Sequence, residues 1–116
     1  MADMAGTADT AERRFAMLVG LEVTDDAVYA RYRAAMKPIL HRMGGAFTCD
    51  FRVSEVLAGD VTGAVDPRVN RVFALSFPDA SARDAFFGDP EYLAAKREFF
   101  ERSVGAVVVL GEYQSV

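Results

Sequence analysis

One short segment combines side chains that could hold a small molecule with the alternation typical of a strand. Its apolar positions are Phe47, Cys49, Phe51 and Val53, and the polar positions between them are Thr48, Asp50, Arg52 and Ser54. A period of two predicts a β-strand with one apolar and one polar face. If water covers the polar face, Asp50 and Arg52 are ordinary hydrated residues. If helices or a second chain cover it, they become candidate ligand-binding residues for a carboxylate or phenolate, with Arg52 first.

Aromatic side chains supply the second group of candidates. Tyr29, Tyr32 and Tyr92 fall within predicted helices, where such rings most often pack in the core with the hydroxyl at its rim. The functional alternative is a hydrogen bond from the hydroxyl to a ligand, for which we select Tyr32 and Tyr92. Phe77 and Phe86 are candidates for the apolar wall of a pocket, although they would serve a packed core equally well.

The single histidine and the single cysteine exclude several kinds of site. His41 alone cannot assemble the multi-histidine sites of iron and zinc enzymes. It also lies roughly 200° around its helix from Ile39, away from the apolar stripe. Cys49 is expected to be buried as a small apolar residue. One cysteine allows no disulfide within the chain, which favours a reducing, cytoplasmic location.

Motifs that mark several common enzyme classes do not occur in the sequence. It contains no Gly-x-Ser-x-Gly nucleophile motif and no Gly-x-Gly-x-x-Gly dinucleotide motif, and residues 59–63 lack the Lys-Ser/Thr ending of a phosphate-binding loop. We therefore expect no metal, flavin or nicotinamide cofactor, and hydrolase, kinase and dinucleotide-dependent activities are disfavoured. No residue type or spacing identifies a catalytic group.

Length and composition indicate one folded domain. The chain has 116 residues, 52% of them hydrophobic, and a formal net charge of −4. Residues 1–13 have no sustained apolar face and are expected to form a flexible tail before a single domain over 14–116. A weakly acidic chain without a Lys/Arg cluster is not expected to bind nucleic acid. No apolar run approaches the roughly 20 residues that span a bilayer, so no membrane association is expected.

Hydrophobic periodicity divides the chain into two strand–helix–strand units joined by a long loop. The strands are predicted at residues 15–21, 47–53, 71–77 and 106–113, with the loop at 57–70. With right-handed crossovers, the order βαββαβ predicts a ferredoxin-like α+β fold. In that fold, helices cover one face of a four-stranded antiparallel sheet.

End signals place the helices between those strands. The first helix is expected to run from a Thr24 N-cap to Gly44-Gly45, with a kink at Pro38. The second half of the chain is expected to form two helical segments. Their end signals are Asp79, Gly88, Asp89-Pro90 and a stop near Ser103.

Several short motifs, in order along the chain, resemble the domain of unknown function 1330 family. The motifs are VTDD (23–26) leading to Tyr29 and Tyr32, GGAF (44–47), FPDA (77–80) leading to Phe86, DPEYL (89–93) and VVLGEY (108–113). The resemblance covers residues 15–113 and departs from the family pattern at Phe99, where members often carry arginine, and in the longer loop 57–70. It implies the dimeric α+β barrel superfamily, a homodimer and a pocket between sheet and helices. It implies no agreed reaction, although superfamily relatives include cofactor-free monooxygenases and isomerase-like proteins.

The first and last strands add an independent argument for a homodimer. Side chains on both faces of the strands at 15–21 and 106–113 are apolar, yet helices can cover only one face of the sheet. A second copy would cover the other face. We therefore expect a homodimer that binds a small, largely apolar or aromatic molecule, with cofactor-free oxygenation or isomerisation as a hypothesis for its chemistry. The alternative is a non-catalytic binding or protein-interaction module with a packed core.

Overall fold

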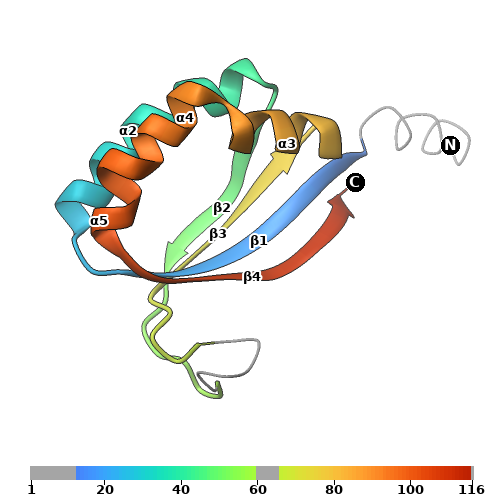
Figure 1. Ribbon diagram of the computed structural model, residues 1–116. Helices are drawn as coiled ribbons and strands as arrows, with labels where there is room; N and C mark the ends of the chain where they lie inside the picture. The colour runs from blue at the N-terminus through green and yellow to red at the C-terminus, as the bar shows by residue number, and fades with distance from the viewer. Residues whose placement is uncertain (1–12, 60–65, 116) are drawn as a thin grey trace, which may run out of the picture.

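Four strands and a layer of helices make up the computed structural model, which describes residues 13–59 and 66–115 (Figure 1). The elements are β1 (Arg14–Val23), α2 (Asp26–Arg42), β2 (Ala46–Arg52), β3 (Arg71–Phe77), α3 (Ala80–Gly88), α4 (Pro90–Ala95), the π-helical η1 (Lys96–Phe100), α5 (Glu101–Ser103) and β4 (Val104–Ser115). The expected tail at 1–13 lies, apart from Arg13, outside the described residues. Among the described residues, no helix has the length and hydropathy needed to cross a membrane.

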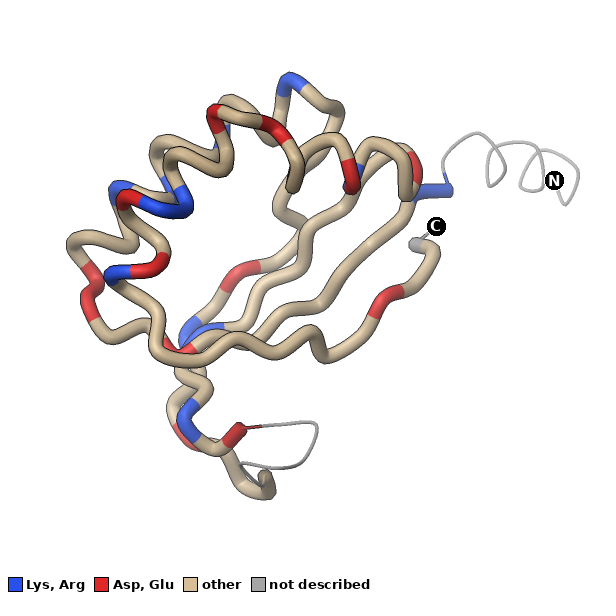
Figure 2. The backbone as a smooth tube through the Cα atoms, in the orientation of Figure 1, with Lys and Arg blue, Asp and Glu red and all other residues tan. Residues whose placement is uncertain are grey.

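The strands form one antiparallel sheet in the order β2-β3-β1-β4, with β1 and β3 at its centre. All helices lie on one face of this sheet (Figure 1), which confirms the predicted ferredoxin-like arrangement. Figure 2 shows the charged residues along the helical layer, whereas β1 and β3 carry them only near their ends. The sheet therefore presents a mainly apolar surface to the helices.

Helix α2 begins at a different cap from the one predicted. The backbone N–H of Thr24 donates to the carbonyl of Ser103 (2.8 Å), which ties Thr24 to the end of α5. The extended Asp25 is the N-cap instead, and its carboxylate accepts a hydrogen bond from the backbone N–H of Val28 (3.0 Å). The helix remains continuous through Pro38, where a kink was expected.

The other predicted helix ends are confirmed. Gly44 has a φ of +78°, the left-handed conformation that terminates helices, and follows Met43, the C-cap of α2. The Asp79 carboxylate accepts from the backbone N–H of Ala82 at the start of α3. The Asp89 carboxylate accepts from the N–H groups of Glu91 and Tyr92 at the start of α4. These carboxylates satisfy N–H groups that have no partner inside a helix.

A β-bulge in β2 overturns the expected division of that strand into an apolar and a polar face. Phe47 pairs with Leu75 and Cys49 with Ala74, so Thr48 is an additional residue without a partner. Because an extra residue reverses the side on which later side chains lie, Phe47 faces the helices together with Asp50. Cys49 and Phe51 face away from them. Cys49 is exposed rather than buried as expected.

Candidate functional site

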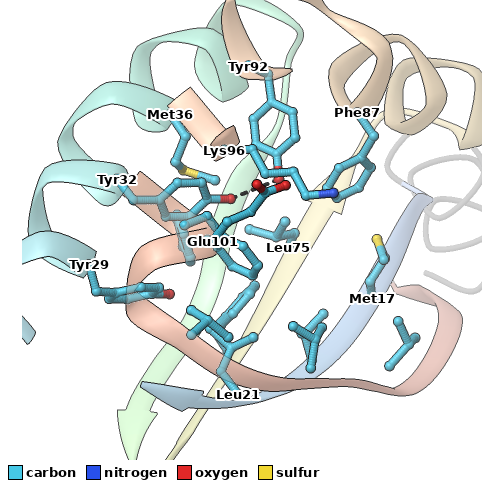
Figure 3. A pocket seen from close by; sticks show the side chains of 17 residues that line it. Met17, Leu21, Tyr29, Tyr32, Met36, Leu75, Phe87, Tyr92, Lys96 and Glu101 are labelled. Carbon is cyan, nitrogen blue, oxygen red and sulfur yellow. Dashed lines mark hydrogen bonds between the residues drawn. The ribbon is translucent and has the colours of Figure 1, made fainter. Parts of the chain in front are cut away.

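A cavity of about 480 Å³ lies between the helix-facing side of the sheet and the helices. Figure 3 shows the side chains that surround it. Its floor comes from the strands and consists of Met17, Val19, Leu21, Phe73 and Leu75. These side chains share one face because alternate strand positions point the same way, and the register places β1 and β3 side by side. The floor is thus entirely apolar.

The roof comes from α2 and from the helical segments α4 to α5. Tyr29, Tyr32 and Met36 follow one another along α2 at spacings of three and four residues, so they share a face. Tyr92 and Phe100 reach the cavity from the second half of the chain. The rings of Tyr32 and Phe100 are 4.9 Å apart, which joins the two halves of the roof.

Three buried phenols supply the polar groups of the interior. The hydroxyls of Tyr32 and Tyr92 are 2.9 Å apart and hydrogen-bonded to each other. The Tyr29 hydroxyl is also buried but has no hydrogen-bond partner within the described part of the chain. Burial raises the pKa of Tyr29 to about 12 and raises the pKa of Tyr32 and of Tyr92 above the usual value near 10. All three therefore keep their protons at neutral pH and can act as hydrogen-bond donors.

The opening of the cavity lies over the edge strand β4. Val107 and Val109 line the cavity, yet they are 54% and 47% exposed because the helices do not extend over this strand. Lys96 and Glu101 line the cavity from the helical side. In an α-helix, residues five positions apart diverge by roughly 140°. The wider π-helical turn of η1 brings Lys96 and Glu101 to the same side.

Of the predicted site residues, the two tyrosines line the cavity and the two phenylalanines lie behind it. Phe77 and Phe86 are completely buried and do not line the cavity. The Phe86 ring packs 4.4 Å from that of Tyr92 and 5.0 Å from that of Phe87, and both of these neighbours do line it. Phe86 therefore supports the wall of the cavity from outside.

Asp50 and Arg52 do not line the cavity. The Asp50 carboxylate forms ion pairs with Arg33 of α2 and with Nε of Arg71 (3.3 Å). The Arg52 side chain is 70% exposed and pairs with Asp26 (3.4 Å). The structure thus covers Asp50 with a helix and leaves Arg52 in solvent.

The Arg33–Asp50–Arg71 cluster borders the Tyr29 end of the cavity. The Arg71 guanidinium lies 5.1 Å from the centre of the Tyr29 ring. The Arg33 guanidinium lies 4.1 Å from the centre of the Phe47 ring, and Phe47 also lines the cavity. His41 is exposed, as expected. In the described ranges, no three His, Cys, Asp or Glu side chains are grouped so that they could hold a metal ion.

Sequence reasoning selected neither Tyr29 nor the charged residues of the opening. Tyr29 carries a sequence signal, because it lies three residues before Tyr32 on the same helix face. Lys96 and Glu101 carry none, because an α-helical register separates them and only the π-helical turn brings them together.

The comparisons with known proteins agree with this architecture. A family model described as Domain of unknown function (DUF1330) matches residues 16–113. No curated protein matches the chain.

Solved structures resemble the whole chain at low sequence identity. A protein of unknown function from Rhodopseudomonas palustris has 17% identity and a TM-score of 0.68, covering 97% of this chain and 92% of its own. A DABB family protein with a ferredoxin-like fold from Mesorhizobium loti has 17% identity and a TM-score of 0.57, with coverages of 90% and 97%. A dimeric ferredoxin-like protein of unknown function from Jannaschia sp. has 17% identity and a TM-score of 0.56, with coverages of 89% and 98%. At such identities the likeness establishes the fold alone.

Proposed function

The chain belongs to the DUF1330 family, whose description names no function, and we propose from the site itself that it binds a small, largely apolar molecule in the cavity between sheet and helices. The open cavity carries this proposal. Its volume of about 480 Å³ lies within the range of roughly 300–1,000 Å³ typical of ligand pockets. A module with a packed core, the alternative suggested by the sequence, would fill this space with side chains.

The chemistry of the cavity supports binding and assigns no catalytic residue. Its walls are mainly apolar, its buried polar groups are the neutral phenols of Tyr29, Tyr32 and Tyr92, and Lys96 and Glu101 add one charge of each sign. Protonated phenols donate hydrogen bonds and do not act as general bases. The ligand best suited to this interior has an apolar body and an oxygen that accepts a hydrogen bond.

We further propose that the functional unit is a homodimer in a reducing compartment. Phe51 and Tyr113 are 52% and 47% exposed on the face of the sheet that none of the described helices covers. Exposed apolar area of this kind often belongs to an interface. The similar structures from Jannaschia sp. and Bacteroides fragilis are described as dimeric. The exposed free thiol of Cys49 is best preserved under reducing conditions.

Ligand binding can be tested with N-phenyl-1-naphthylamine, a neutral apolar dye whose fluorescence rises in apolar pockets. We expect saturable binding to the purified protein, and native mass spectrometry of protein isolated from cells should detect a retained small molecule. Val109→Trp should block the cavity and reduce dye affinity at least about tenfold. The control is Leu93→Trp, which enlarges an exposed residue of α4 that does not line the cavity. If the wild-type protein and both variants bound the dye with equal affinity, the proposal would be contradicted.

A further inference from the structure

The Tyr29 hydroxyl is a buried hydrogen-bond donor that the protein itself does not satisfy. The residue is only 1% exposed, and no backbone or side-chain group of residues 13–59 and 66–115 accepts from its hydroxyl. Figure 3 shows this hydroxyl pointing toward the interior of the cavity. A buried polar group without a partner is unfavourable, and most such groups in proteins have one. An acceptor atom of a bound molecule would satisfy it.

The charges next to Tyr29 favour a negatively charged acceptor. The guanidiniums of Arg33 and Arg71 both pair with the single carboxylate of Asp50, so positive charge is in excess beside the phenol. Asp26 lies 3.9 Å from Arg71, but it is mostly exposed and also pairs with Arg52. Nε of Arg33 is itself buried and has no partner among the residues that the structure describes.

The other polar groups of the interior do not compete for the same acceptor. Tyr32 and Tyr92 are hydrogen-bonded to each other. Lys96 and Glu101 also line the cavity, are half-buried and exposed respectively, and carry opposite charges. The unsatisfied donor and the excess positive charge therefore coincide at one end of the cavity, which gives a bound molecule a defined orientation.

On the basis of the proposed function, we propose that the ligand is an aromatic or alicyclic monocarboxylic acid whose carboxylate accepts a hydrogen bond from the Tyr29 hydroxyl. The ring then lies on the apolar floor formed by Phe73, Leu75 and Leu21. Hydrogen bonds between a neutral donor and an ionised acceptor are stronger than neutral ones. The two guanidiniums offset the unfavourable burial of the carboxylate. Arg33 and Arg71 act through their charge and do not need to contact the ligand.

The state of the phenol is consistent with this role. Burial has the largest effect on the Tyr29 pKa, which it raises, while the positive charges of Arg33 and Arg71 act in the opposite direction. Those cations therefore stabilise negative charge at the phenol oxygen. A carboxylate oxygen within hydrogen-bond distance of the same atom experiences a field of the same sign.

The test uses three probes with the same ring system: 2-naphthoate, 2-acetylnaphthalene and 2-methylnaphthalene. They present a carboxylate, a neutral carbonyl and no acceptor. We expect the full-length protein to bind naphthoate most tightly in fluorescence or calorimetric titrations near neutral pH. Tyr29→Phe should weaken naphthoate binding at least about tenfold, the change expected for loss of one charge-assisted hydrogen bond. It should leave methylnaphthalene affinity unchanged. The control His41→Ala changes an exposed residue of α2 outside the cavity and should change neither affinity.

Each result separates this inference from the proposed function. If acetylnaphthalene binds as tightly as naphthoate, or if Tyr29→Phe does not weaken naphthoate, the carboxylate site is refuted while cavity binding stands. If methylnaphthalene binds and naphthoate does not, the same conclusion follows. If no probe binds the wild-type protein, both proposals fail. Since Tyr29→Phe removes an unsatisfied hydroxyl, its melting temperature without ligand should not fall, which excludes misfolding as the cause of lost binding.

Discussion

Phe47 and Asp50 lie on the same helix-facing side of β2, although three positions separate them along the strand. The Arg33 guanidinium contacts both, since it stacks on the Phe47 ring and pairs with the Asp50 carboxylate. In a regular strand, residues three positions apart face opposite sides. The bulge at Thr48 removes that difference. It turns Asp50 from a surface residue into the centre of an ion-pair cluster beside the cavity.

We expect Asp50→Ala to destabilise the protein by about 2 kcal/mol, because it leaves the half-buried guanidiniums of Arg33 and Arg71 without their shared carboxylate. The measurement is the free energy of unfolding from urea denaturation. The control is Asp26→Ala, which removes a mostly exposed carboxylate and should change stability by less than about 0.5 kcal/mol. Equal effects of the two substitutions would show that Asp50 is not covered as described.

Tyr29→Phe should stabilise the ligand-free protein by about 1 kcal/mol. The substitution keeps the ring in the core and removes a buried hydroxyl that has no partner. Tyr32→Phe breaks the hydrogen bond to Tyr92 and should instead destabilise by about 1 kcal/mol. Urea denaturation of the two variants gives the comparison. A loss of stability in Tyr29→Phe would mean that its hydroxyl has a partner inside the protein.

Stability should fall as the pH rises above 10. The unfolded chain releases phenolic protons near the ordinary tyrosine value of 10.0, whereas the folded-state pKa of Tyr29 is about 12 and those of Tyr32 and Tyr92 are also raised. The folded state therefore binds more protons in this range, and its stability is full below pH 10 and is lost as the pH rises toward 12. Urea midpoints measured across this range, with tyrosinate absorbance of the folded protein, test the prediction. The double variant Tyr32→Phe/Tyr92→Phe should show a smaller loss.

Arg52→Ala should change the affinity for 2-naphthoate less than twofold. Arg52 was the first candidate from strand alternation, but its side chain is in solvent and pairs with Asp26 outside the cavity. His41→Ala should also have little effect, because His41 is exposed on α2. A tenfold loss of affinity in a folded Arg52→Ala variant would place the ligand beside Arg52 and outside the cavity.

Phe51→Asp should disrupt the proposed homodimer. Phe51 is half-exposed on the face of the sheet that the helices leave uncovered, and a carboxylate there would be buried by a second copy. In sedimentation equilibrium at micromolar concentration, the wild-type protein should have the mass of a dimer and Phe51→Asp that of a monomer. The unfolding midpoint should rise with protein concentration for the wild type alone. Leu57→Asp, at an exposed position after β2, is the control and should remain dimeric.

Local signals in the sequence determined most of the fold. The caps at Asp79 and Asp89 and the helix end at Gly44 were predicted correctly because each involves hydrogen bonds or dihedral angles within a few residues. The order of strands and helices followed from hydrophobic periodicity, and this order, together with the right-handed crossover rule, left one sheet arrangement. The position of Tyr32 on the buried face of α2 followed in the same way.

Tertiary structure alone decided how those elements form the site. Tyr32 and Tyr92 are 60 positions apart, so the packing of α2 against α4 was needed to join their hydroxyls. The bulge at Thr48 depends on pairing with β3, because a strand in isolation does not reveal which residue lacks a partner. Among the described residues, the Tyr29 hydroxyl and Nε of Arg33 are both buried without a hydrogen-bond partner, a property that only the packing of α2 against the sheet creates. The burial of a polar group and its hydrogen-bond partners are properties of the packed chain. The sequence specifies them only through the complete fold.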